Sequence, residues 1–124
     1  MSNVNEAVLR YFSAWNERDA RRRRELVAAT WTEDGHYVDP ARHGRGHDAI
    51  DAMIAQAQER FPGHALNLVS GIEAHNGRVR FTWAAGGTRD APLYLRGTDF
   101  GELADDGRFR SVVGFVDAAP AATH

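Results

Sequence analysis

The chain has 124 residues, of which 43% are hydrophobic and 26% are charged, and it carries a formal net charge of −2 and no cysteine. This is the length and composition of one globular domain with a single core. The charge gives no reason to expect nucleic acid or an anionic membrane as partner, and without cysteine there is no disulfide framework, thiolate nucleophile or cysteine-based metal site.

Three helices are predicted in the first half of the chain. Apolar residues at helical spacing predict an amphipathic helix over 3–17, and Asp19 is a plausible N-cap for a second helix that ends near Thr30. The four arginines at 21–24 are expected on its solvated face, since a charge run usually faces water. A third helix is predicted over 47–61, where Pro62 and Gly63 stop it.

One short strand is expected between the second and third helices. Residues 32–35 read as a break after the second helix, and His36 to Asp39 then alternate as a strand. Pro40 ends the pairing of that strand because proline has no N–H to donate. Gly44 to Gly46 read as a loop.

The second half of the chain predicts two antiparallel hairpins. Asn76-Gly77 is a strong signal for the first turn, and Asp105 to Gly107 mark the second. The four strands are expected at 66–72, 79–83, 93–103 and 109–116. Glycines at 97, 101 and 114 would let the sheet curl around a cavity. Helices followed by a curled antiparallel sheet give an α+β fold.

The whole of residues 1–117 is expected to form one domain, with 118–124 as a flexible tail. No apolar run approaches the length of a membrane span. The first residues lead directly into a polar helix pattern without an apolar signal core, so a cytoplasmic location is expected.

The most informative residues are two aspartates, each placed inside a run that otherwise reads as half-buried strand. Asp39 follows Tyr37 and Val38, and Asp99 lies between Thr98 and Phe100. A charge in such a position costs free energy unless something uses or neutralises it. If both side chains reach one apolar cavity, their environments can push their pKa values apart, leaving one as a base and the other as a protonated donor.

Structural roles are open for the same residues. Asp99 could bond a backbone N–H or an arginine such as Arg96 or Arg110, and Asp39 could simply start a turn before proline. Tyr11 lies in the apolar stripe of the first helix, where tyrosine is usually part of the core. The large aromatic residues could form core or line a pocket, and His64 could face its mouth; these candidates for ligand contact are Trp15, Trp31, Phe61, His64, Trp83 and Phe115.

Metal chemistry is not indicated by the sequence. The six histidines show no ligand spacing on a helix or strand, and none forms a zinc motif. No glycine-rich loop follows a strand in dinucleotide-binding order, and no serine lies in a nucleophile elbow. Neither a metal nor an organic cofactor is therefore expected.

Over residues 4–117 the chain resembles the NTF2-like superfamily, in particular its SnoaL-like and ketosteroid-isomerase-like branch. The stretches that carry the resemblance are Arg10 to Asp19, Thr32 to Pro40, Gly46 to Ile50 and Gly97 to Phe100. The resemblance implies a cone-shaped fold, in which three N-terminal helices pack on a strongly curved, antiparallel-rich sheet that encloses a pocket. It also implies a homodimer.

The resemblance further implies roles for three residues. Asp39 looks like the counterpart of the proton-shuttling base of ketosteroid isomerases, and Tyr11 and Asp99 correspond to their oxyanion hole. In the polyketide-cyclase branch the late-strand aspartate, again Asp99, is the main acid and base. The expected function is an isomerase or aldol-type cyclase acting without cofactor on a small apolar carbonyl compound, steroid-like or polyketide-like.

Two other functions fit the same fold. Epoxide hydrolysis would need a water held between the two acids. A carrier of small ligands, or a homodimeric interaction module, would use the same cone without chemistry, because fold does not fix function. The enzyme predicts a raised pKa for Asp99 and loss of turnover on its mutation, whereas a binding module predicts ligand retention with ordinary titration.

Overall fold

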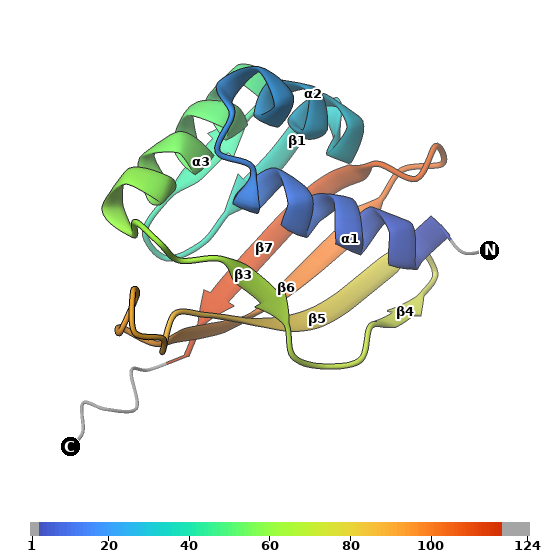
Figure 1. The fold of residues 1–124 in the computed structure, drawn as a ribbon. Helices are drawn as coiled ribbons and strands as arrows, with labels where there is room; N and C mark the ends of the chain where they lie inside the picture. The colour runs from blue at the N-terminus through green and yellow to red at the C-terminus, as the bar shows by residue number, and fades with distance from the viewer. Residues whose placement is uncertain (1–2, 118–124) are drawn as a thin grey trace.

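The structure is a computed structural model and describes residues 3–117; the predicted tail at 118–124 lies outside the described residues. Within these residues, three helices and seven strands form the α+β architecture expected from the sequence (Figure 1). The helices are α1 (Asn3–Asn16), α2 (Ala20–Thr30) and α3 (His47–Arg60). The strands are β1 (Trp31–Val38), β2 (His43–Arg45), β3 (Leu66–Leu68), β4 (Glu73–His75), β5 (Arg78–Ala85), β6 (Leu95–Leu103) and β7 (Phe109–Val116).

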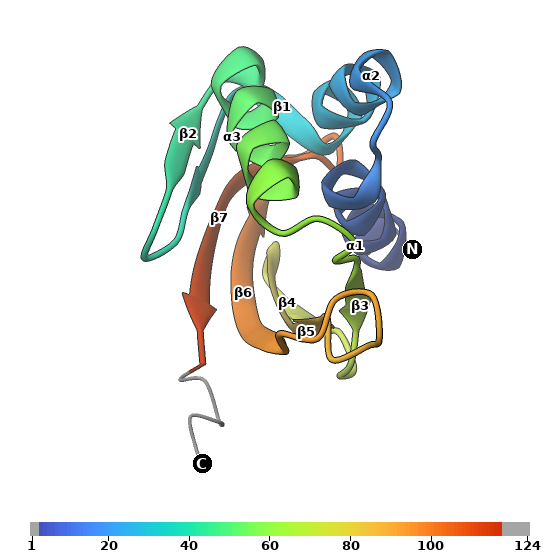
Figure 2. The ribbon, with the colours of Figure 1, turned by 60° about the vertical axis from the view of Figure 1, so that its left-hand side comes forward.

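The strands form one curved sheet in the order β2-β1-β7-β6-β5-β3, with β4 also paired to β5. The pair β1 and β7 is parallel, and the other pairs are antiparallel. All three helices lie on the concave side of the sheet, and α1 crosses it (Figures 1 and 2). The sheet is not closed into a barrel, so the space between its concave face and the helices can hold a pocket.

The apolar stripe of α1 forms the centre of the core, as its spacing predicts. Val8 and Tyr11 are completely buried, and Tyr11 packs edge-on against Phe81 of β5 and Phe109 of β7. Edge-to-face aromatic pairs contribute about 0.5–1.5 kcal/mol each beyond the area they bury. Helix α1 therefore packs on the middle of the sheet, and these contacts fix the position of the Tyr11 ring.

Helix α2 begins as predicted, but its arginine run is not wholly solvated. The Asp19 carboxylate caps the helix by accepting a hydrogen bond of 2.9 Å from the Arg22 N–H. Arg23, which was expected in solvent, is buried against α3, where its Nε donates to Asp51 Oδ1 at 2.8 Å and it also donates to Gln58. One residue in four of the run faces the neighbouring helix, because helical periodicity turns it inward.

Strand β1 starts earlier than predicted, because it pairs with a distant strand. The sequence predicts a break over 32–35, yet the chain is extended from Trp31, which pairs in parallel with Phe109 at an irregular position of the ladder. Gly35 lies against Trp31, where a Cβ would come within 2.8 Å of the Trp31 side chain. Residues 43–45, predicted as loop, pair with β1 as β2.

The two predicted hairpins are present, and the first differs in detail. Asn76 and Gly77 both have positive φ, which the tight Asn-Gly turn requires. The strand expected over 66–72 ends at Leu68 as β3, and a second short strand, β4, begins at Glu73. Between them the Ser70 hydroxyl accepts from the Thr82 N–H at 2.8 Å in place of a strand carbonyl. The strand expected from Leu93 begins at Leu95.

Within residues 3–117, no helix is long and apolar enough to cross a membrane. The cytoplasmic location expected from the sequence stays a prediction.

Candidate active site

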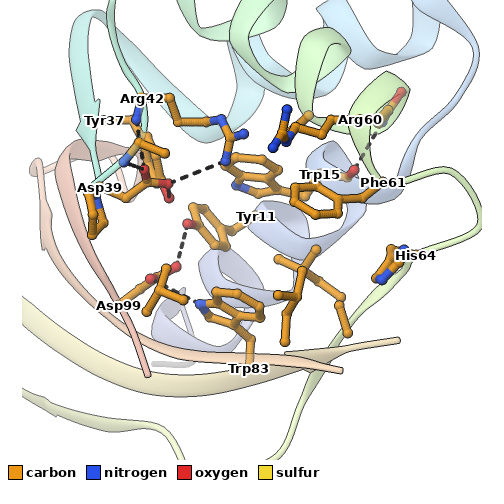
Figure 3. Close-up of a pocket in the computed structure, with 18 of the residues that line it drawn as sticks. Tyr11, Trp15, Tyr37, Asp39, Arg42, Arg60, Phe61, His64, Trp83 and Asp99 are labelled. Carbon is orange, nitrogen blue, oxygen red and sulfur yellow. Dashed lines mark hydrogen bonds and ion pairs between the residues drawn. The ribbon is translucent and has the colours of Figure 1, made fainter. Parts of the chain in front are cut away.

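A cavity of about 380 Å³ lies between the concave face of the sheet and the helices. All three predicted catalytic residues, Asp39, Asp99 and Tyr11, line it (Figure 3). Four of the six residues predicted to contact a ligand line it as well: Trp15, Phe61, His64 and Trp83. The fold thus brings seven of the nine predicted residues together, from α1, β5, β6 and the segments that follow β1 and α3.

Asp99 lies at the bottom of the cavity, on the inward face of β6, with 1% of its surface exposed. Its Oδ2 accepts a hydrogen bond of 2.6 Å from the Tyr11 hydroxyl, and its Oδ1 accepts one of 3.2 Å from the Trp83 indole N–H. Within residues 3–117, the two arginines considered as structural partners pair elsewhere, Arg96 with Asp117 and Arg110 with Glu102. Gly97, two residues earlier on the same face, leaves room for the Trp83 ring, since a Cβ there would come within 2.6 Å of it.

Burial raises the pKa of Asp99 from its ordinary 3.8 to about 6. Removal from water is the largest cause, the negative charge of Asp39 raises the pKa further, and the hydrogen bonds from Tyr11 and Trp83 partly oppose the shift. A carboxyl group with a pKa near 6 changes protonation state easily near neutral pH, which is the property of a general acid and base.

Tyr11 joins the core to the acid. Its ring contacts aromatic side chains on several sides, and its hydroxyl reaches Asp99. Burial, followed by the negative charge of Asp99, raises the pKa of Tyr11 well above its ordinary value. Tyr11 is therefore a neutral hydrogen-bond donor, which is the state an oxyanion hole needs.

Asp39 lies at the cavity wall directly after β1, with its carboxylate fully engaged. Its Oδ1 accepts from the backbone N–H groups of Ala41 and Arg42 at 2.8 and 2.9 Å. Its Oδ2 accepts from the Tyr37 hydroxyl at 2.7 Å and lies 3.9 Å from the Arg42 guanidinium. The side chain orders the turn, as the structural alternative expects, and it also lines the cavity, whereas its catalytic role stays a prediction.

Tyr37 completes the site and was not among the predicted residues. Its ring is buried edge-on against Trp15, and burial, with the charges of Asp99 and Asp39, raises its pKa. A signal was available in the sequence, because Tyr37 is two residues before Asp39, and residues at that spacing share one face of a strand.

Gly114 on β7 explains how the two acids can lie so close to one another. A Cβ at this position would come within 2.8 Å of Asp99 Oδ1, 3.1 Å of the Tyr37 hydroxyl and 3.3 Å of the Asp39 Cβ. Because glycine has no side chain, the two acidic residues and the Tyr37 hydroxyl can occupy the space beside β7. Of the three glycines predicted to shape the sheet, Gly114 is the one at the chemical centre.

Two residues predicted to contact a ligand lie elsewhere. Trp31 is completely buried in the core beside Tyr11. Phe115 is 56% exposed and packs on Phe100. Gly114 faces the cavity, so its neighbour Phe115 must point to the opposite, convex face of β7. Neither residue is among those that line the cavity.

Three arginines of the cavity wall were missed by the sequence analysis. They are Arg18 after α1, Arg42 after Asp39 and Arg60 at the end of α3. Arg18 falls within the stretch Arg10 to Asp19 that carries the family resemblance, but no local pattern marks any of the three arginines as a cavity residue. Among the residues that the structure describes, no group of three histidine or acidic side chains could hold a metal ion.

The chain matches the family of SnoaL-like domains over residues 8–112. It is 38% identical to a protein from Agrobacterium tumefaciens C58 that is provisionally named an isomerase of the SnoaL-like family; the two structures superpose with a TM-score of 0.87, covering 95% of this chain and 100% of that one. No curated protein matches the chain.

Two more distant structures share the fold. A provisionally named SnoaL-like polyketide cyclase from Jannaschia sp. CCS1 is 20% identical, with a TM-score of 0.76 over 94% of this chain and 86% of that one. A protein from Catenulispora acidiphila with a ketosteroid-isomerase-like fold, in complex with trimethylamine, is 17% identical, with a TM-score of 0.73 over 88% and 83%. The NTF2-like architecture expected from the sequence is thus confirmed, and the chain belongs to the family of SnoaL-like domains.

Proposed function

We propose that the protein is an enzyme that uses acid and base catalysis without a cofactor on a small, largely apolar carbonyl compound. The observation that carries this proposal is the buried Asp99, with its pKa raised to about 6, at the bottom of an aromatic cavity. A buried acid with a perturbed pKa in a cleft is characteristic of functional sites. The name of the Agrobacterium relative, an isomerase, agrees with this chemistry.

The contacts of the two acids support a division of roles that differs from the one expected from the sequence. Asp39, expected as the base, already accepts three hydrogen bonds, one from the Tyr37 hydroxyl and two from the backbone N–H groups of the turn after β1. Asp99 is buried, and its pKa is raised to about 6. We therefore assign proton transfer to Asp99 and assign Asp39 to holding Tyr37 and Arg42 in place.

The reaction follows from these positions. The ionised Asp99 takes a proton from the carbon next to the carbonyl, and the electrons of the broken C–H bond move onto the carbonyl oxygen to give an enolate. Once Asp99 is neutral, Tyr11 loses its charged acceptor and can donate its hydrogen bond to the enolate oxygen. Return of the proton from Asp99 to another carbon gives isomerisation. Attack of the enolate carbon on a second carbonyl breaks the π bond of that carbonyl and gives an alkoxide, which takes the proton back from Asp99 to complete an aldol cyclisation.

An absorbance assay for conjugated enones formed from a panel of β,γ-unsaturated ketones tests this function. Asp99→Asn should lower turnover by about 10²- to 10⁴-fold, the usual contribution of a general acid or base. Asp39→Asn should cost less than Asp99→Asn if the assigned roles hold, and more if Asp39 is the base. Turnover that survives in Asp99→Asn rejects the role of that residue.

A second function, a non-catalytic module that binds small ligands, is favoured by one observation. Both carboxylates are already hydrogen-bonded within the protein, so neither needs a substrate to satisfy it. Such a module would retain apolar ligands in Asp99→Asn and would show no turnover in either form. Calorimetry measures the binding of apolar ligands and the enone assay measures turnover, so the two measurements together separate a binding module from an enzyme.

We also propose that the protein forms a homodimer through the convex face of its sheet. Phe100, Val113 and Phe115 are exposed there on β6 and β7, and the two phenylalanine rings contact each other. Exposed apolar patches of this kind mark interaction sites. Phe115→Asp should convert a dimer to a monomer in analytical ultracentrifugation, whereas Arg21→Asp on the outer side of α2 should not; a wild-type monomer would overturn the proposal.

A further inference from the structure

The wall of the cavity carries more positive than negative charge, although the chain as a whole has a formal charge of −2. Three arginines line it, Arg18, Arg42 and Arg60, against two carboxylates, Asp39 and Asp99. With its pKa raised to about 6, Asp99 also takes up a proton more easily than an ordinary carboxyl group. An apolar cavity with an excess of guanidinium groups favours a ligand that carries negative charge.

Arg42 has hydrogen-bond donors to spare. Its side chain is 25% exposed, and its ion contact with Asp39 Oδ2 spans 3.9 Å, too long for a hydrogen bond. The oxygens of Asp39 are occupied by Tyr37 and by two backbone N–H groups instead. Within residues 3–117 the Arg42 guanidinium makes no hydrogen bond, although it carries five N–H donors in a planar fork. Such a fork matches a carboxylate in two parallel hydrogen bonds.

Arg60 brings a second guanidinium to the same cavity. It lies in the last turn of α3, with its guanidinium carbon 5.9 Å from the centre of the Phe61 ring. It has no carboxylate within ion-pair distance among the described residues. Arg18 is different, because it donates to the His64 carbonyl oxygen at 2.8 Å and so ties the loop after α3 to α1. Arg42 and Arg60 are therefore the cations available to a ligand.

The two available cations and the acid lie on different sides of the cavity. Figure 3 shows Arg42 and Arg60 on the side of Trp15 and Phe61, with Asp99 and Trp83 on the other side of Tyr11. A ligand held by the arginines at one end would place its apolar body along the aromatic wall. Its other end would then reach Asp99.

Resting on the proposed function, we propose that the substrate of this site is an apolar carbonyl compound that bears a carboxylate, and that Arg42 and Arg60 select it by binding this group. The carboxylate fixes the orientation, so the reacting carbon is presented to Asp99. Arg42 and Arg60 determine specificity, and they take no part in proton transfer.

A matched pair of ligands tests the proposal, namely 2-naphthylacetate and 2-naphthylacetamide, which share shape and apolar surface and differ in charge. Affinities are measured by isothermal titration calorimetry for the wild type and for Arg42→Gln, Arg60→Gln and the double variant. Arg21→Gln is the matched control, because Arg21 is exposed on α2 outside the cavity wall. Thermal unfolding of each variant checks that it is folded.

The wild type and Arg21→Gln should bind the acid at least about tenfold more tightly than the amide, since hydrogen bonds between charged groups are strong. Each single variant should lower this preference, and the double variant should remove it. Equal affinity for acid and amide in the wild type, no binding of the acid, or an unchanged preference in the double variant would each overturn the proposal.

Measuring both turnover and acid preference in Asp99→Asn separates this proposal from the function on which it rests. Asp99→Asn should retain the preference for the acid while losing turnover. A preference for the acid in a protein without any turnover would uphold the anion site and reject the enzyme. Turnover without a preference for the acid would uphold the enzyme and reject the anion site.

Discussion

Replacing Asp99 by asparagine should stabilise the protein at neutral pH. The pKa of the group is raised from 3.8 to about 6 by folding, so the folded state binds its proton more tightly than the unfolded state. The stability linked to this proton is complete below about pH 3.8 and is lost as the pH rises through about 6. The shift corresponds to roughly 3 kcal/mol at 1.36 kcal/mol per pKa unit.

Asparagine is close in shape to the protonated acid and carries no charge at any pH. It keeps an oxygen that can accept from Trp83. Asp99→Asn should therefore be more stable than the wild type by up to about 3 kcal/mol at pH 7.5. The difference should shrink toward zero near pH 4, where the wild-type acid is itself neutral.

Urea unfolding at pH 4, 6 and 7.5 measures this difference directly. Asp105→Asn is the matched control, because Asp105 is exposed in the turn between β6 and β7. The difference in free energy of unfolding between Asp105→Asn and the wild type should not grow with pH as it does for Asp99→Asn. If Asp99→Asn were less stable than the wild type at pH 7.5, the ionised carboxylate would be a stabilising structural group, and the reasoning from burial would be refuted.

Three further substitutions have expected outcomes. Gly114→Ala should destabilise the fold by about 1–3 kcal/mol in urea unfolding and lower turnover, because its methyl group would meet the Asp99 carboxylate. Tyr11→Phe removes a hydrogen bond that lowers the pKa of Asp99, so carboxyl carbon NMR should show that pKa higher than in the wild type. Arg23→Met should cost about 3–5 kcal/mol by leaving Asp51 buried and unpaired, and Asp51→Leu in the same chain should recover much of the loss.

The helices and the acid at the cavity bottom could be predicted because their signals are local. The stripe of α1 repeats at helical spacing, and Asp99 lies among small and apolar residues of one strand. The start of β1 could not be predicted, because Trp31 is extended by its pairing with Phe109, a residue far along the chain. The residues around Trp31 do not indicate that the chain pairs there with Phe109.

The direction of a side chain in a strand is equally hard to assign from sequence alone. Phe115 alternates with Gly114, and only the position of Asp99 on the neighbouring strand decides which of them faces the cavity. Arg42 reaches the cavity because the Asp39 carboxylate orders the turn after β1 through two backbone N–H groups. Its contribution depends on that turn and not on a motif.

Exchange of the proton next to a ketone for deuterium tests the central claim, because isomerase and aldol cyclase both need this step. Proton NMR in deuterated water follows the exchange on a panel of apolar ketones and oxo-acids, for the wild type, Asp99→Asn and Asp39→Asn. The account predicts wild-type exchange that rises as the pH passes about 6 and falls by about 10²- to 10⁴-fold in Asp99→Asn, with a smaller loss in Asp39→Asn. Equal exchange by wild type and Asp99→Asn would contradict it.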